Sequence, residues 1–175
     1  KELTDRLGDE FEFDMITLRK HASAFERIGK VNVHRVGFPW QGKRTGSSKI
    51  FPLSKTLFPL FAFWKARSLQ KERHYDAVWG MMAAYAGFAA LFFKLRHPHI
   101  PLLLTLQEGD PIPHIKRRAA LVYPLFILIF RRANMIQAIS NYLGGFGRHM
   151  GFTGPLEVIP NGVDVEHFAT ATPRD

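Results

Sequence analysis

The chain has 175 residues, of which 46% are hydrophobic, and 24 Lys and Arg against 15 Asp and Glu give a formal net charge of +9. This hydrophobic fraction is typical of a folded domain and excludes a disordered chain. The sequence has no cysteine, which excludes disulfide bonds and thiolate metal sites and is consistent with a reducing compartment. The positive charge favours an anionic partner, such as nucleic acid, an acidic membrane or a phosphorylated substrate.

The N-terminal part of the chain predicts short elements followed by one long loop. In chain order we expect a helix over residues 2–7, a strand over 11–18, a short helix over 22–28 and a strand over Val31–Val36. Residues 37–54 are rich in Gly, Pro, Ser and Thr, which predicts a long mobile loop. A helix over residues 60–73 is expected to begin only after Pro59, because proline is poorly tolerated inside helices.

From residue 77 onward, strands and helices alternate regularly. We expect strands over residues 77–81, 101–106, 135–139 and 156–159, and helices over residues 83–95, about 115–132 and 140–150. The helix over 83–95 is apolar on almost every side, and its small residues favour close backbone packing. This alternation predicts parallel strands joined by right-handed crossovers. The expected fold is α/β, a doubly wound and mostly parallel Rossmann-like sheet with helices on both faces.

Two apolar stretches bear on a membrane location. Residues 121–130 and 57–64 are uncharged, but each is much shorter than a bilayer-spanning helix and each contains a proline. Neither is expected to span a membrane. Association of one of them with a bilayer surface stays open.

In an open parallel sheet, ligands bind beyond the carboxyl ends of the strands. The loop after the strand at 101–106 contains Gln107, Glu108, Gly109 and Asp110. Two carboxylates, an amide and a glycine suit a hydroxyl-rich ligand. A turn before Pro111 with a solvated Glu108 explains the same residues equally well.

Ser140 and Asn141 follow the strand at 135–139, where free backbone N–H groups could attract an anion. A simple N-cap is the preferred interpretation of these two residues. The glycines at 144, 145 and 147 lie inside a helical pattern and make a weak nucleotide fingerprint. The eight histidines have no metal-ligand spacing, and no metal site is expected.

The order of four segments is recognisable. They are YDAVWG at 75–80, IPLLLT at 100–105, MIQAIS at 135–140 and VIPNGVDVEHF at 158–168. Together they resemble the N-terminal domain of a family 4 glycosyltransferase with the GT-B architecture. Such enzymes have two domains and retain the configuration of the sugar that they transfer.

The resemblance implies an acceptor-side domain over residues 1–160 and the start of a linker over 161–175. A first strand and a glycine-rich loop would precede Lys1, and a C-terminal domain would bind the nucleotide-diphosphate sugar donor. We therefore expect this part of the enzyme to bind no cofactor and to be inactive alone, since the donors and cations that stabilise the leaving diphosphate would lie in the other domain.

Carried over by position, the resemblance assigns no catalytic residue to this domain. Glu108 stands where members often have a histidine, so a histidine-based role does not transfer. The expected acceptor-binding residues are Gln107, Glu108, Gly109, Asp110, Ser140 and Asn141, and Asn161 and Gly162 are expected at the interdomain cleft. We expect the acceptor to be a sugar or a lipid-linked molecule. We expect a cytoplasmic location, with peripheral contact to the membrane as an option. Binding of nucleic acid is not expected.

Three alternatives stay open. The positive charge would suit a nucleic-acid-binding domain, but the phenylalanines fall mostly in apolar runs and not between basic residues. A non-catalytic membrane-surface or interaction module could use the same fold. A doubly wound sugar-nucleotide epimerase would require the dinucleotide fingerprint that this sequence does not contain.

Overall fold

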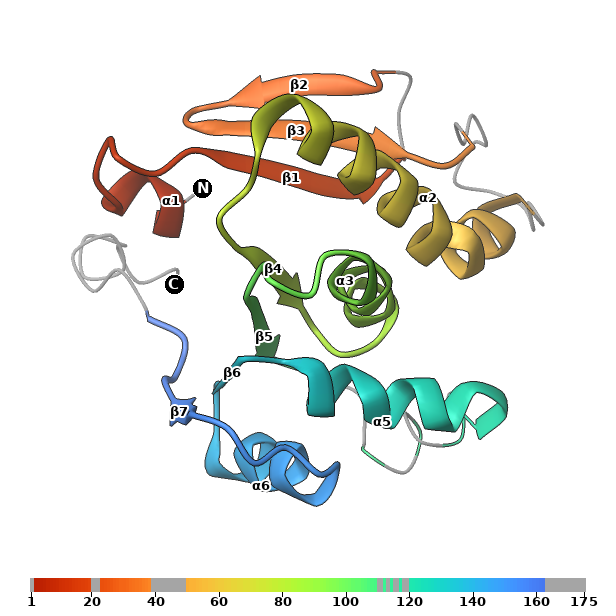
Figure 1. Ribbon diagram of the computed structural model, residues 1–175, viewed down its shortest axis with the longest axis vertical. Helices are drawn as coiled ribbons and strands as arrows, with labels where there is room; N and C mark the ends of the chain where they lie inside the picture. Colours follow the sequence, from red (N-terminus) through yellow and green to blue (C-terminus); the bar gives the residue numbers. More distant parts are fainter. Residues whose placement is uncertain are drawn as a thin grey trace, which may run out of the picture.

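The computed structural model describes residues 2–19, 23–38, 50–109, 112, 114, 117 and 120–162 (Figure 1). The strands are β1 (Phe13–Leu18), β2 (Phe25–Ile28), β3 (Val31–Val36), β4 (Val78–Met81), β5 (Leu102–Leu106), β6 (Met135–Ala138) and β7 (Leu156–Val158). The helices are α1 (Glu2–Arg6), α2 (Ile50–Arg73), α3 (Tyr85–Arg96), α5 (Tyr123–Arg132) and α6 (Asn141–His149), with a 3-10 turn η1 (Ala120–Val122) before α5.

The C-terminal part of the fold is a four-stranded sheet in the order β4-β5-β6-β7, and each neighbouring pair is parallel. Helices α3, α5 and α6 link its strands and flank it (Figure 1). The predicted α/β class with a Rossmann-like parallel sheet is confirmed. All four strands of this sheet were predicted from the sequence to within one residue at each end.

The N-terminal part is a three-stranded sheet in the order β1-β3-β2. Strands β1 and β3 are parallel, whereas β2 is antiparallel to β3. The short helix predicted over residues 22–28 is therefore wrong: residues 25–28 form strand β2, and residues 23 and 24 are not helical. Gly29 adopts a φ of 59° in the tight turn between β2 and β3, and this left-handed turn reverses the chain into a hairpin.

Helix α2 is longer than the sequence predicts. It begins at Ile50, so the loop prediction over residues 37–54 is wrong from residue 50 onward, and residues 39–49 lie outside the described part of the chain. Pro59 lies inside the helix at a cost of about 3 kcal/mol. Burial of Ala62 and Leu69, each less than 5% exposed, and packing of α2 on α3, β1 and β3 offset that cost.

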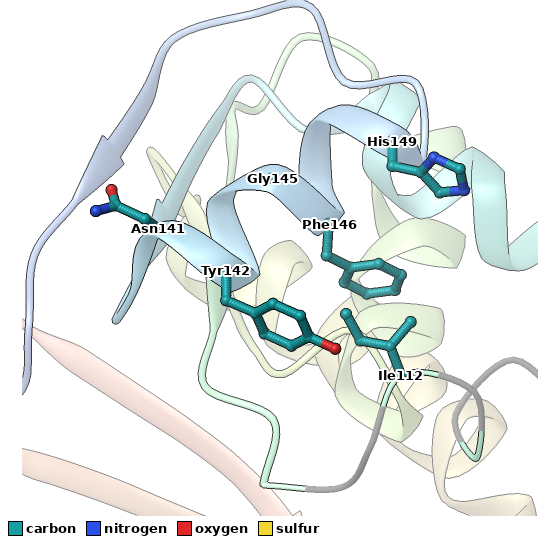
Figure 2. A pocket seen from close by; sticks show the side chains of 6 residues that line it. All are labelled: Ile112, Asn141, Tyr142, Gly145, Phe146 and His149. Carbon is teal, nitrogen blue, oxygen red and sulfur yellow. The ribbon is translucent and has the colours of Figure 1, made fainter.

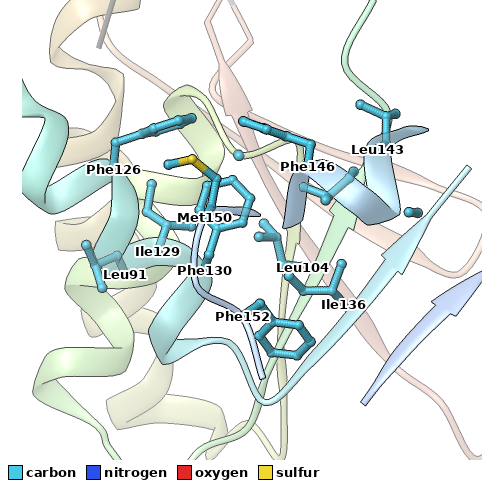
Figure 3. Close-up of a cluster of buried hydrophobic side chains, with 13 residues drawn as sticks. Leu91, Leu104, Phe126, Ile129, Phe130, Ile136, Leu143, Phe146, Met150 and Phe152 are labelled. Carbon is cyan, nitrogen blue, oxygen red and sulfur yellow. The ribbon is translucent and has the colours of Figure 1, made fainter. Parts of the chain in front are cut away.

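The main hydrophobic core fills the space between the four-stranded sheet and its helices (Figure 3). Phe130 of α5 is fully buried, and its ring meets those of Phe126 and Phe146 edge to face, with centroids 5.4 Å apart in each pair. The small residues of α3 permit close packing of helices, as predicted. A Cβ at Gly87 would lie 3.2 Å from Ile129 of α5, tighter than an ordinary contact, so the missing side chain of residue 87 favours the close approach of α3 and α5.

Two glycines of α6 also have a packing role. A Cβ at Gly144 would lie 3.2 Å from Leu156, and one at Gly147 would lie 3.2 Å from Leu106. Both glycines let α6 lie close against the sheet. Helix–sheet packing thus accounts for Gly144 and Gly147 of the glycine-rich run.

A buried carboxylate joins the N-terminal sheet to the rest of the fold. The side chain of Asp14 on β1 is 4% exposed and hydrogen-bonds His34 Nε2 at 2.7 Å. The Tyr75 hydroxyl, just before β4, donates to its other oxygen at 2.5 Å, and Arg73 Nη1 lies 3.4 Å from that oxygen. Burial opposes ionisation of Asp14, but these donors and charges outweigh it and hold its pKa below the ordinary value.

No helix among the residues that the structure describes combines the length and the apolar character needed to cross a bilayer.

Candidate functional site

The carboxyl ends of β4, β5, β6 and β7 share one edge of the parallel sheet. Three polar segments leave this edge: the loop at 107–109 after β5, Ser140 after β6, and Asn161 and Gly162 after β7. Pairing of the Ile159 N–H with the Ala138 carbonyl at 2.8 Å extends the register of β7 beyond its last residue. Glu108 and Asn161 therefore follow strands that end at the same edge, as the sequence predicts.

Glu108 is the most unusual side chain at this edge. The residue is only 9% exposed, and one carboxylate oxygen, Oε1, accepts a hydrogen bond of 2.5 Å from the backbone N–H of Ala83. Its other oxygen, Oε2, is buried with no hydrogen-bond partner in the described structure. A buried carboxylate oxygen without a donor is costly, because water no longer solvates it.

Burial raises the pKa of Glu108 above its ordinary value, although backbone hydrogen bonds, that of Ala83 first, act in the opposite direction. A carboxyl group in this state binds a proton more readily than an exposed one. It can accept a hydrogen bond from a ligand hydroxyl when ionised, and donate one when protonated. Perturbed carboxyls of this kind gather at functional sites.

The loop that Glu108 contacts is itself strained. Met82, directly after β4, has a φ of 70°, which is unfavourable for a residue with a side chain. The Met82 N–H donates to the Thr105 carbonyl at 2.8 Å, and the next N–H, that of Ala83, donates to Glu108. Two hydrogen bonds from β5 and its loop thus hold the strained turn in place. Strain of this kind is most often found where a loop serves a ligand.

The remaining predicted residues have different environments. Gln107 is half-buried, and Gly109 is exposed with open space where a side chain would lie. Asp110 lies outside the described residues. Ser140 is the N-cap of α6, and its hydroxyl accepts from the Leu143 N–H at 3.3 Å, which confirms the capping interpretation. Asn141, Asn161 and Gly162 are exposed.

A shallow depression of about 390 Å³ begins at this edge and runs along the outer side of α6 (Figure 2). Its lining residues are Ile112, Asn141, Tyr142, Gly145, Phe146 and His149. Figure 2 shows Tyr142, Phe146 and Ile112 pointing toward one another, whereas the Asn141 side chain points away from them. An apolar floor with a phenol and an imidazole at its rim can hold a ligand that has both apolar and hydroxyl groups.

Sequence reasoning missed several of these features. Tyr142, Phe146 and His149 recur at helical spacing on one side of α6, and this signal was available in the sequence. The contact from Ala83 to Glu108 joins two loops 25 residues apart, and nothing in the sequence indicates it. Among the described residues, no group of three or more His, Asp or Glu side chains could hold a metal ion.

A four-stranded parallel sheet flanked by helices defines the class of this protein, an α/β domain with a Rossmann-like sheet, and polar loops gather at the carboxyl edge of that sheet. Comparison with known families gives the particular family. The model described as Glycosyltransferase Family 4 matches residues 1–167, and the chain therefore belongs to Glycosyltransferase Family 4. The family expected from the sequence motifs is confirmed.

A solved structure also supports the fold. A sucrose-phosphate synthase from Thermosynechococcus elongatus matches with a TM-score of 0.58 and 15% sequence identity, over 89% of this chain and 79% of that chain. At this identity the likeness concerns the fold alone. A search of curated proteins found no match to the sequence.

Proposed function

We propose that this domain binds the acceptor in a reaction that moves a sugar from a nucleotide-diphosphate sugar to an acceptor hydroxyl with retention of configuration. Membership of Glycosyltransferase Family 4 supports sugar transfer in general. The acceptor side is supported by the under-bonded Glu108 carboxyl at the carboxyl edge of the sheet and by the depression that begins at Asn141, at the same edge.

In the proposed reaction the acceptor oxygen forms a bond to the anomeric carbon of the sugar. The bond from that carbon to the diphosphate oxygen breaks, and the bonding electrons leave with the diphosphate. The hydroxyl proton is transferred to the departing phosphate. Negative charge therefore builds up on the diphosphate, and we assign the groups that stabilise it to a further domain of the enzyme.

Glu108 is the residue on which the proposal depends. Its Oε2 atom lacks a donor, and a hydroxyl of the acceptor next to the reacting one is a donor that would satisfy it. In this role Glu108 holds the acceptor so that its reacting hydroxyl lies beside the sugar carbon, on the same face as the leaving diphosphate, and the exposed Asn141 and Asn161 contact other hydroxyls along the same edge. Asp110 and Gln107 are proposed to contribute from the same loop.

The test is transfer activity of the complete enzyme with Glu108→Gln. Uridine and guanosine diphosphate sugars serve as donors, with panels of free sugars and polyprenyl-linked sugars as acceptors, and release of nucleoside diphosphate is the readout. Glutamine keeps an oxygen that can accept from Ala83 but loses the charged acceptor. We expect the KM for the acceptor to rise about tenfold, which corresponds to about 1.4 kcal/mol, while the KM for the donor stays unchanged.

Glu72→Gln is the matched control. Glu72 is exposed near the C-terminal end of α2, close in sequence to the start of β4 and so at the other end of the strands. This variant should behave as the unmodified enzyme. Unchanged acceptor KM in Glu108→Gln, or a rise in the donor KM instead, would remove Glu108 from the acceptor site.

We further propose that the acceptor is lipid-linked and that the enzyme works at the cytoplasmic face of a membrane. The apolar floor of the depression and the net charge of +9 support an amphiphilic, membrane-borne acceptor. Transfer to free sugars with no activity toward polyprenyl-linked ones would contradict this proposal and leave the sugar-transfer proposal intact.

A further inference from the structure

Helix α2 carries large apolar side chains on its solvent side. Leu53 is 52% exposed, Leu60 is 48% exposed and Trp64 is 60% exposed. Spacings of seven and four residues place all three on one face of the helix. Trp64 is the clearest anomaly, since tryptophan is highly buried on average in folded proteins.

The opposite side of α2 is already occupied. Ala62 and Leu69 are buried, and the helix packs on α3, β1 and β3. Phe63, next to Trp64 in sequence, meets Phe92 of α3 edge to face at 6.3 Å. The exposed leucines and Trp64 therefore point away from the core.

Basic side chains continue this face toward the C-terminal end of the helix. The Arg67 guanidinium lies 5.4 Å from the centre of the Trp64 ring, and the exposed Lys71 follows one turn later. Over its whole length the helix has one acidic residue, Glu72, and the basic residues Lys55, Lys65, Arg67, Lys71 and Arg73. We define Leu53, Leu60, Trp64, Arg67 and Lys71 as the α2 stripe.

We propose that the α2 stripe docks this domain on a bilayer that contains anionic lipid. A helix that lies in the interface inserts leucine and tryptophan at the level of the headgroups and places arginine and lysine among the phosphates. Helix α2 is about 36 Å long, so it can lie along the surface. Parallel pairing with a second copy of the chain is disfavoured by charge, because it would bring Arg67 and Lys71 of both copies together, and an antiparallel pair is an outcome that the test distinguishes.

The orientation of α2 connects this surface to the site. Ser54 accepts a hydrogen bond from the Phe38 N–H just after β3, at 3.2 Å, and Lys55 lies 5.1 Å from the centre of the Tyr85 ring just after β4. The Leu53 end of the stripe is therefore close to the carboxyl ends of these strands. Docking along α2 would hold the acceptor edge beside the membrane. The inference rests on the proposed lipid-linked acceptor for its purpose, but its test does not measure sugar transfer.

The test is sedimentation of the protein with phosphatidylcholine vesicles, with and without about one third phosphatidylglycerol. We expect the protein to sediment with the anionic vesicles and to stay in solution with the neutral ones. The double variant R67E/K71E should weaken binding about twentyfold or more, because each basic residue near an anionic surface contributes about fivefold. L60S/W64S should weaken binding at least about tenfold through lost apolar burial.

Matched controls lie on strand β2. Phe25 is 53% exposed and Arg27 is also exposed, so Phe25→Ser and Arg27→Glu change an aromatic and a charge away from the stripe. Both should bind vesicles as the unmodified protein does. Circular dichroism and the urea midpoint confirm that every variant is folded.

Three results would overturn the inference. They are no binding to anionic vesicles, binding that R67E/K71E leaves unchanged, and a dimer in solution that Trp64→Ser dissociates. The variants of the stripe should still transfer sugar to an acceptor dissolved in detergent. Failure of docking and failure of the proposed reaction are therefore separate outcomes.

Discussion

The two sheets each carry one buried carboxylate, and the two differ in how they are bonded. Asp14 in the β1–β3 part has hydrogen bonds from Tyr75 and His34 and a nearby Arg73. Glu108 in the β4–β7 part is bonded by backbone N–H groups, that of Ala83 to Oε1 first, and its Oε2 has no hydrogen-bond partner among the described residues. The pKa of Asp14 is lowered, and that of Glu108 is raised.

The apolar packing around the two carboxylates shows the opposite trend: it is denser around Glu108, the carboxylate with an oxygen that has no hydrogen-bond partner among the described residues. The β4–β7 sheet packs against a dense apolar core. The β1–β3 sheet has exposed apolar side chains such as Phe25 and Met15, and it depends more on its polar contacts. A fully bonded carboxylate is thus typical of a structural role. An under-bonded one in a well-packed region is the better candidate for contact with a ligand.

The largest expected effect tests the apolar core. Phe130→Ala removes a fully buried ring and should lower the free energy of unfolding by about 3–5 kcal/mol. Phe25→Ala, on the exposed strand β2, should change it by less than about 1 kcal/mol. Urea unfolding followed by circular dichroism measures both. Equal losses would mean that the two sheets are equally packed.

The next effect tests the polar contacts of the β1–β3 part. Asp14→Ala leaves His34, Tyr75 and Arg73 without their shared acceptor and should cost about 3 kcal/mol in the same urea experiment. Asp9→Ala is the control, because that carboxylate is exposed and pairs only with Lys30. The urea midpoint of Asp9→Ala should equal that of the unmodified protein. A loss below that of an ordinary surface change would assign Asp14 no structural role.

A smaller effect separates capping from ligand binding at Ser140. Ser140→Ala should lower the free energy of unfolding by about 1 kcal/mol, whereas Ser140→Asp keeps an N-cap acceptor and should preserve it. Ser68→Ala, on the exposed side of α2, is the control and should be neutral. If Ser140→Ala left stability unchanged but reduced acceptor binding, the hydroxyl would belong to the site.

The smallest expected effect is on how the free energy of unfolding changes with pH, and the two carboxylates should change it in opposite directions. Asp14, whose pKa is lowered from 3.8 by folding, contributes stability above pH 3.8 that is lost as the pH falls through its folded pKa. Glu108, whose pKa is raised from 4.5, contributes stability below pH 4.5 that is lost as the pH rises through its folded pKa.

Urea midpoints measured from about pH 2 to pH 8 check these signs, because that interval extends well below the ordinary pKa of aspartate and well above that of glutamate. Glu108→Gln should remove the fall in stability that Glu108 causes as the pH rises. Asp14→Asn should remove the fall in stability that Asp14 causes as the pH is lowered. If the urea midpoint changed with pH by the same slope in both variants, the two carboxyl groups would not differ in the way proposed.

The sequence predicted the β4–β7 part well because its signals are strong and local. The strand at 102–106 is a buried apolar run, the helix at 85–96 is full of small residues, and Ser140 is a clear N-cap. Glu108 was expected at the correct edge, since the strands are parallel. Its missing donor depends on where the Ala83 N–H points, and that requires the three-dimensional structure.

Errors arose where contacts outside the segment decide the structure. All four side chains of β2 are exposed, so no alternation marks it as a strand, and only pairing with β3 does. Pro59 was expected to precede a helix, but the burial of Pro59 itself and of Ala62 and Leu69 further along the helix keeps it inside α2. Asp14 attracted no attention in the sequence because its partners are 20 and 61 residues away.

Of the three glycines in α6, Gly145 alone has open space where a side chain would lie, and it lines the depression. Because the sequence has no cysteine, Gly145→Cys would provide one thiol for a fluorescent dye. Replacing a glycine inside a helix also tends to stabilise it, by up to about 1 kcal/mol for alanine. Position 145 of α6 is thus suited to carry a fluorescent dye that reports binding of the proposed acceptor in the depression.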